Sequence, residues 1–188
     1  TSMSAGTGFI HHYAGDTILT GDSSSFSGDT IVHGGALSVG SVLGGTVRVE
    51  DGGTLGGIGT VGTTTIALGG TLAPGNSIGT LTVDGDLVFD AGSRFAIEVN
   101  PEGAEGDLVA VTGDATLHGG SVAHIGADGN YDLRSTYTIL SSGALAGEFE
   151  DVTSDFAFLT PDLIYDYGAG TIDLALARND RDFASAAQ

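Results

Sequence analysis

The residues whose types and spacing could support covalent chemistry lie in a glycine-rich segment near the middle of the chain. Residues 75–79 (GNSIG) match the pattern Gly-x-Ser-x-Gly, which in hydrolases exposes a nucleophilic serine between a strand and a helix. Ser77 is instead followed by Thr80–Val83, an alternating segment typical of a strand. The sequence therefore favours an Asn-Ser turn after Pro74, and we expect no catalytic residue at this turn.

A second motif, residues 57–62 (GIGTVG), matches the Gly-x-Gly-x-x-Gly pattern of dinucleotide-binding proteins. In those proteins the glycines open a helix whose N-terminus binds the pyrophosphate. In this chain the β-branched residues 63–66 (TTTI) follow, and such residues favour strands. We expect tight corners of a β-structure at these glycines, and no bound cofactor.

Side chains that bind metals are dispersed along the sequence. Adjacent histidines on a strand point to opposite faces, so His11 and His12 cannot easily share one ion. The histidines form no compact ligand set in sequence: His11, His12, His33, His118 and His124. Three acidic residues could meet on an outer face and bind calcium weakly, although solvated turn residues are the simpler interpretation: Asp84, Asp86 and Asp90. We predict no specific metal site.

The composition excludes several classes of partner. The 188 residues carry 24 acidic side chains against five arginines, for a formal net charge of −19, which disfavours binding to nucleic acid. There is no cysteine, so disulfides and thiolate metal sites are excluded. No apolar run of about 18 residues occurs, and we expect no insertion of this segment into a bilayer. At 40% hydrophobic residues, the chain can still bury a continuous core.

Short alternating segments separated by glycines predict an all-β fold. Residues 46–50 (TVRVE) place their valines on one face, and residues 94–99 (RFAIEV) place Phe95, Ile97 and Val99 on one face. Glycine pairs recur at the expected corners, where the chain needs backbone angles closed to other residues. Two sequence echoes, GDTI at 15–18 and 28–31 and GDL at 85–87 and 106–108, suggest stacked coils. We predict a β-solenoid with parallel stacking.

The packing should change near residue 130, because glycines are frequent before Asn130 and aromatic residues gather between Tyr131 and Tyr167. A solenoid needs a terminal cap, since its last coil otherwise exposes unpaired backbone groups. We predict coils over 1–129, a cap over 130–177 and a linker over 178–188. The predicted cap core comprises Tyr137, Ile139, Phe149, Phe156, Phe158, Leu163, Tyr165, Ile172 and Leu174.

Residues 69–83 (GGTLAPGNSIGTLTV) closely resemble the passenger-associated repeat of bacterial autotransporters. The likeness continues through 85–89 (GDLVF) and 106–109 (GDLV), covering roughly residues 52–125. Residues 137–179 resemble the conserved passenger end called the autochaperone region. The coil-turn motif of the repeat contains Pro74, Gly75, Asn76, Ser77 and Gly79.

This resemblance implies a right-handed parallel β-helix closed by an aromatic-rich β cap. It implies export through the periplasm and the outer membrane to the bacterial cell surface or beyond. The implied partners are the upstream passenger coils and the polypeptide's own outer-membrane β-barrel translocator, toward which residues 178–188 would lead. A host-surface ligand is a further possible partner.

The function that follows is that of a non-enzymatic, membrane-proximal passenger segment, which caps the β-helix, templates its folding and supports its secretion and display. The alternative is an adhesin or self-association surface that binds ligands of a host or a neighbouring cell. A carbohydrate-cleaving β-helix enzyme has little support, because few basic side chains accompany the acids.

Overall fold

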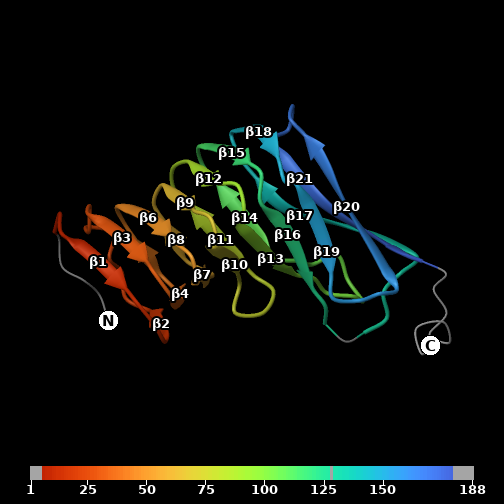
Figure 1. Ribbon diagram of the computed structural model, residues 1–188, viewed down its shortest axis with the longest axis horizontal. Helices are drawn as coiled ribbons and strands as arrows, with labels where there is room; N and C mark the ends of the chain where they lie inside the picture. The colour runs from red at the N-terminus through yellow and green to blue at the C-terminus, as the bar shows by residue number, and fades with distance from the viewer. Residues whose placement is uncertain (1–5, 128, 180–188) are drawn as a thin grey trace.

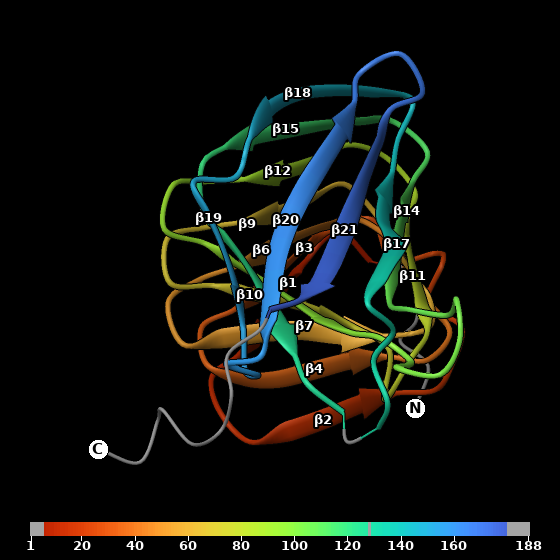
Figure 2. The ribbon, with the colours of Figure 1, turned by 90° about the vertical axis from the view of Figure 1, so that its right-hand side faces the viewer.

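The computed structural model describes residues 6–127 and 129–179, and within them it contains strands and no helix. The strands form three seven-stranded sheets, and the chain visits the sheets in turn, so that three consecutive strands make one coil (Figures 1 and 2). Neighbouring coils pair in parallel. The protein is therefore a three-sided parallel β-helix, as the sequence predicts.

The order of the strands within each sheet follows the stacking of the coils. The first sheet contains β1 (Phe9–His12), β3 (Asp29–Val32), β6 (Thr46–Val49), β9 (Thr64–Ile66), β12 (Leu87–Phe89), β15 (Asp114–His118) and β18 (Ala144–Glu148). The second contains β19 (Asp151–Ser154), β16 (Ser121–Ile125), β13 (Arg94–Glu98), β10 (Thr71–Pro74), β7 (Gly53–Gly57), β4 (Gly35–Val39) and β2 (Asp16–Leu19). The third contains β20 (Leu159–Asp166), β21 (Thr171–Arg178), β17 (Arg134–Ser141), β14 (Leu108–Val111), β11 (Thr80–Val83), β8 (Thr60–Val61) and β5 (Val42–Leu43).

From β6 onward the coils lengthen toward the C-terminus. Asp29 pairs with Thr46, 17 residues later, whereas Asp114 pairs with Ala144, 30 residues later. The added residues lie in the loops between strands, so the helix widens from β1 to β18 (Figure 1). Strand register and coil length are therefore not fixed by a constant repeat.

The coils are stacked as the two sequence echoes suggest, but the echoed segments do not occupy equivalent positions in successive coils. Asp16 lies in β2 of the second sheet, whereas Asp29 lies in β3 of the first. Likewise Leu87 begins β12 of the first sheet, and Leu108 begins β14 of the third. Each echo reflects the similar chemistry of a corner followed by a strand, not one turn of the β-helix.

Alternating side chains fill the interior, as the period of two predicts. Val47 and Val49 are at most 2% exposed, and Phe95, Ile97 and Val99 are fully buried. A single apolar cluster runs from Phe26 in the first coil to the final strand. Burial of stacked aliphatic and aromatic side chains is thus the main stabilising contribution.

Glycine is required where neighbouring corners approach closely. A Cβ atom at Gly62 would overlap the carbonyl oxygen of Gly45 in the preceding coil. Gly45 itself has φ of +77°, a left-handed conformation that favours glycine. The paired glycines therefore let backbone stack directly on backbone at the corners.

Parallel pairing continues past residue 129. β18 pairs with β15 and β19 pairs with β16, so two sides of a further coil extend to Ser154. The chain then forms a hairpin of β20 and β21, in which β21 runs antiparallel to both β17 and β20. The division into 1–129, 130–177 and 178–188 stays a prediction, and most of the predicted linker lies outside the described residues.

We predict that Phe95→Ala lowers the free energy of unfolding by about 3–5 kcal/mol, because it leaves a cavity in the fully buried interior. The matched control is Phe158→Ala, since Phe158 is only partly buried and packs at the margin of the same core. Urea denaturation of both variants measures the difference. Equal losses in the two variants would contradict this description of the core.

Candidate functional site

The C-terminal end of the β-helix is closed by a hairpin. β21 pairs antiparallel with β17 and with β20, so the third sheet continues as a β-hairpin after parallel pairing ends. Seen from this end, β20 and β21 lie across the ring formed by the coils (Figure 2). The reversal of direction is what distinguishes this end from every earlier coil.

Alternation in β21 positions the closing side chains. Ile172, Leu174 and Leu176 are at most 1% exposed and belong to the continuous core, while the residues between them face outward. From the facing strand β20, Leu163 and Tyr165 pack against the same core and stay partly exposed. The hairpin therefore presents its apolar face to the last coil.

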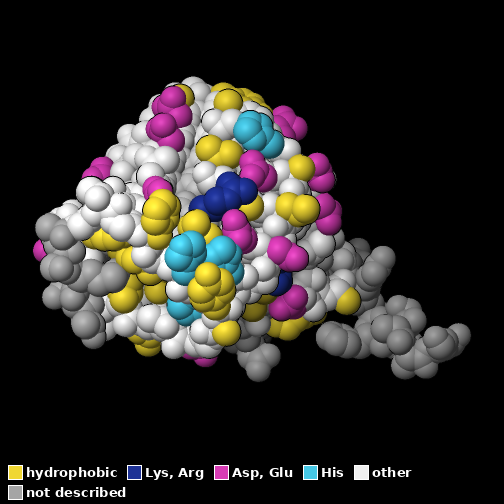
Figure 3. Space-filling view, turned by 60° about the vertical axis from the view of Figure 1, so that its left-hand side comes forward, with side chains coloured by type: hydrophobic (Ala, Val, Ile, Leu, Met, Phe, Trp, Pro, Cys, Tyr) yellow, Lys and Arg dark blue, Asp and Glu magenta, His cyan; other side chains and the backbone are white. Residues whose placement is uncertain are grey.

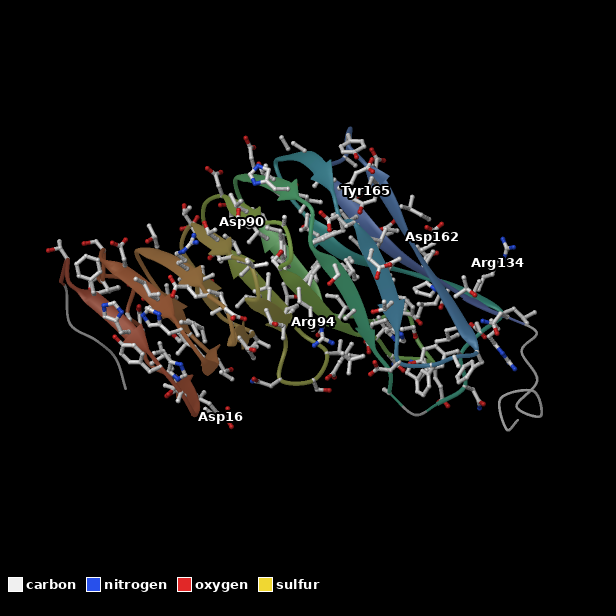
Figure 4. All side chains as sticks on the ribbon, in the orientation of Figure 1. Asp16, Asp90, Arg94, Arg134, Asp162 and Tyr165 are labelled. Atoms are coloured by element: carbon white, nitrogen blue, oxygen red, sulfur yellow. The ribbon has the colours of Figure 1, made fainter. Side chains whose placement is uncertain are left out.

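Aromatic rings link the hairpin to the last coils. The Phe149 ring is centred 5.0 Å from that of Phe89, edge-on, and 6.0 Å from that of Phe95. The backbone N–H of Phe149 donates to the Tyr165 hydroxyl over 3.0 Å. Burial raises the pKa of Tyr165, so the hydroxyl keeps its proton and acts as a neutral acceptor. Figure 4 shows Tyr165 on β20, toward β18.

A second aromatic group lies at the corner between β19 and β20. The Tyr131 ring is centred 5.5 Å from Phe156 and 6.1 Å from Phe158. Tyr131 is buried, whereas Phe156 and Phe158 are partly buried and pack at the edge of the core. This group covers one corner of the coil and does not fill its centre.

The remaining predicted cap residues lie on β17. Tyr137 and Ile139 are at most 2% exposed, and both belong to the interior cluster. The Tyr137 hydroxyl donates to the carbonyl oxygen of Asn100 over 3.0 Å, which ties β17 to the loop after β13. The structure thus gathers the predicted cap core at one end of the molecule, although the role of these residues in folding stays a prediction.

The predicted coil-turn motif forms a folded-back loop after β10. Pro74 is buried at the end of the strand, Gly75 has φ of +84°, and Asn76 and Ser77 are exposed. Gly75 exchanges two backbone hydrogen bonds with Gly57, of 2.9 and 3.2 Å. The loop is therefore anchored to the coil below it.

Asp107, which sequence reasoning did not single out, holds this loop to the next coil. Its side chain is 2% exposed and accepts two hydrogen bonds of 2.9 Å, from the N–H of Gly79 and from the N–H of Glu98. Burial raises its pKa from 3.8 to about 7, with a further rise from the charge of Glu98, against the two N–H donors. No spacing signal in the sequence identifies this contact, because it joins residues 28 and 9 positions apart.

Two serines, Ser77 and Ser154, can be tested for the partners that a nucleophilic serine needs. Ser77 is exposed on the coil-turn loop, and no hydrogen bond joins it to a histidine among the residues described. Ser154 lies with its Oγ 2.9 Å from Nδ1 of His124, but His124 is fully buried and its Nε2 atom lacks a partner in the described part of the chain. A serine nucleophile needs a base that a third group orients and access for substrate. His124 is buried, and among the described residues no third group forms a hydrogen bond with its Nε2.

His124 is held as a neutral core residue. Burial lowers its pKa, and the charge of Asp155 opposes this shift only in part. Its ring meets the Tyr131 ring edge-on at 5.8 Å. The Ser154–His124 contact joins β19 to β16 in the last coil.

On the outer face of the first sheet, the structure brings together two histidines that are 22 positions apart. His11 and His33 approach each other by their ring nitrogens, while the neighbouring His12 turns inward and bonds to Gly34 and Thr17. The opposite orientation of His11 and His12 confirms the strand argument. The pairing across coils could not be found from sequence, because the register was unknown.

With this geometry in place, comparison with known proteins identifies relatives. The chain is similar to two extracellular serine proteases of Serratia marcescens. One is 35% identical over 185 residues, covering 93% of this chain and 17% of its own length. The other is 30% identical over 194 residues, covering 97% of this chain and 18% of its own length. No family model matches the chain.

The chain thus spans less than a fifth of the length of these relatives, while nearly all of it aligns with them. The β-helix and its closed end belong to one continuous region of similarity. Over residues 6–127 and 129–179, no helix is long and apolar enough to cross a membrane.

We predict that the ionisation of Asp107 lowers the free energy of unfolding as pH rises from about 4 to 7. The folded state keeps its proton up to about pH 7, whereas the unfolded state loses it near 3.8, so the folded state binds more protons in this window. Asp107→Asn removes the ionisation. The free energy of unfolding of Asp107→Asn, relative to that of the unsubstituted chain, should therefore increase by about 4 kcal/mol between pH 4 and pH 8.

Urea denaturation at both pH values measures this difference. Asp86→Asn is the matched control, because Asp86 is exposed and also accepts one backbone hydrogen bond, from Asp114. A difference between Asp107→Asn and the parent chain that does not change with pH would show that Asp107 titrates normally.

Proposed function

We propose that this chain is a non-enzymatic, membrane-proximal segment of an autotransporter passenger. In this proposal it closes the β-helix, templates the folding of the coils before it, and supports secretion and surface display. Support comes from the closing hairpin, from the resemblance of residues 69–83 to the passenger-associated repeat, and from relatives named as extracellular proteins. The location proposed for this chain is accordingly the bacterial cell surface or the extracellular space.

The observation that carries the proposal is the antiparallel reversal at β21. A parallel coil leaves one edge of each strand unpaired, and an open end would also expose the aliphatic cross-section. In this chain β21 continues the third sheet while Ile172, Leu174 and Leu176 extend the core. Each such side chain contributes about 1.5–3 kcal/mol by burial, so the hairpin is a stable terminal element.

A stable end can act as a template because of how coils gain stability. Forming the first coil costs loop-closure entropy before any stacking interaction offsets it, whereas each later coil packs on a coil that has already folded. The closed end combines the longest strands with the aromatic contacts of Phe149. We infer that folding begins at this end and proceeds toward β1.

The opposite end supports the proposed upstream partner. Among the described residues, β1 and β2 are the outermost strands of the first and second sheets, so each can accept a further parallel strand on its outer edge. Passenger coils that precede this chain would pair there, and the β-barrel translocator would follow its C-terminal side. Both partners are part of the proposal.

A kinetic comparison tests the template. Leu174 in β21 and Leu55 in β7 are both fully buried, so Leu→Ala at either site should cost about 2–5 kcal/mol. If folding starts at the closed end, Leu174→Ala slows refolding, whereas Leu55→Ala leaves the refolding rate nearly unchanged and speeds unfolding. Stopped-flow refolding and unfolding in urea separate the two.

In cells, a full-length precursor carrying Leu174→Ala should reach the surface in smaller amounts than one carrying Leu55→Ala. Surface labelling and protease resistance of the exported passenger measure this. Equal export together with equal refolding rates would remove the templating role, and the hairpin would then be a passive cap.

The non-enzymatic part of the proposal has its own test, because the relatives are named serine proteases. We expect that a fluorophosphonate probe, which labels activated serines, does not modify this chain. Ser77→Ala and Ser154→Ala serve as controls for the exposed turn serine and for the half-buried serine next to His124. Labelling that disappears in either variant would show a nucleophilic serine and overturn this assignment.

A further inference from the structure

The first sheet carries a cluster of rings on its outer face at the narrow end of the β-helix. The rings of Phe9, His11, Tyr13 and His33 stack, with centroid separations between 4.7 and 6.1 Å and interplanar angles of at most 24°. Figure 3 shows histidine and hydrophobic side chains gathered next to arginine and acidic groups on this face. The proposed folding role makes no use of this cluster.

Two imidazoles face each other within it. Nδ1 of His11 lies 2.9 Å from Nε2 of His33, and Nδ1 of His33 lies 2.7 Å from Oε2 of Glu50. The carboxylate can only accept, so His33 carries its proton on Nδ1 and directs the lone pair of Nε2 toward His11. A carboxylate that accepts the N–H of one histidine nitrogen, so that the other nitrogen carries the lone pair, is the usual outer partner of a metal-binding histidine.

The separation of the two nitrogens fits an ion between them. Histidine nitrogens bind zinc at about 2.0–2.1 Å, and two of them at a tetrahedral angle lie about 3.3 Å apart. The observed 2.9 Å needs to grow by only a few tenths of an ångström, with the proton of His11 moved to Nε2. The stacking of Tyr13 on His33, at 4.7 Å, restricts the ring rotation that would otherwise cost entropy.

We propose that His11 and His33 bind a divalent transition-metal ion of the zinc and nickel class, with Glu50 as the positioning carboxylate. Water completes the coordination, since no group of three or more metal-binding side chains occurs among the residues described. Imidazole nitrogen suits these ions better than calcium or magnesium. The site is open to solvent, because His11 is exposed and the His33 side chain is 28% exposed.

The surrounding charges leave the site accessible to cations. The formal net charge of −19 raises the local concentration of cations around the molecule. Arg48 is the opposing charge, with its Nε 3.7 Å from Oε1 of Glu50. It pairs with the carboxylate oxygen that does not contact His33, so the geometry of the proposed site is preserved.

An ion at this position joins two coils. His11 belongs to β1, and His33 follows β3, the next strand of the first sheet. Binding to the folded state alone raises the melting temperature in proportion to the logarithm of the metal concentration above the dissociation constant. The ion would therefore fasten the first coil to the second at the narrow end.

The test titrates the 188-residue chain, prepared without a histidine tag, with ZnCl₂ and with NiCl₂ in a calorimeter. We expect one equivalent of ion bound by the unsubstituted chain, and at least tenfold weaker binding by His11→Ala and by His33→Ala. Glu50→Gln should weaken binding by about 10- to 100-fold, as for other orienting partners of a histidine ligand. His118→Ala is the matched control, because His118 is an exposed histidine that lies near Asp90, away from the stacked pair.

Thermal denaturation with and without zinc provides a second readout that does not depend on folding yield. Zinc should raise the melting temperature of the parent chain and of His118→Ala, and leave those of His11→Ala and His33→Ala unchanged. Absence of binding at millimolar zinc, or equal binding by His33→Ala and the parent chain, would overturn the proposal. Neither result bears on the kinetic test of the closed end, so the two proposals fail separately.

Discussion

Backbone pairing between coils is the interaction on which the whole molecule depends. Each strand leaves its N–H and C=O groups to be satisfied by the strands above and below, because no strand within one coil is its partner. This need for backbone partners fixes the parallel register and brings the glycine corners into direct contact. It also means that the coil at each end of the stack has a neighbour on one side only. At the C-terminal end β21 and β20 extend the third sheet, while β18 and β19 are the outermost strands of the other two sheets. At the N-terminal end of the described residues, β1 and β2 are the outermost strands of the first and second sheets.

The interior was predictable from the sequence because it depends only on local alternation. The period of two in residues 94–99 places Phe95, Ile97 and Val99 inward whatever strand lies alongside. Register was not predictable, because successive coils differ in length and similar corners recur on different sides of the β-helix. A repeat in sequence therefore identified the kind of corner but not the turn of the helix.

Some residues of the candidate site could likewise be predicted from local alternation, and others could not. Ile172 and Leu174 could be assigned to a buried face from alternation alone, and they are buried. Phe156 and Phe158 follow a corner rather than lie in a strand, and they cover an edge of the core instead of filling it. Asp107, His33 and Ser154 act through partners in other coils or distant loops, and such contacts exist only once the register is set.

The widening of the coils gives the molecule a direction. Because each coil contacts only its neighbours, total stability is approximately a sum over successive interfaces. Wider interfaces with phenylalanine ring contacts therefore contribute more than narrow aliphatic ones. The β-helix therefore tapers toward β1, and its most stable interfaces lie at the wide C-terminal end (Figure 1). A pulling force or a denaturant would separate the narrow coils near β1 before the wide coils near β18.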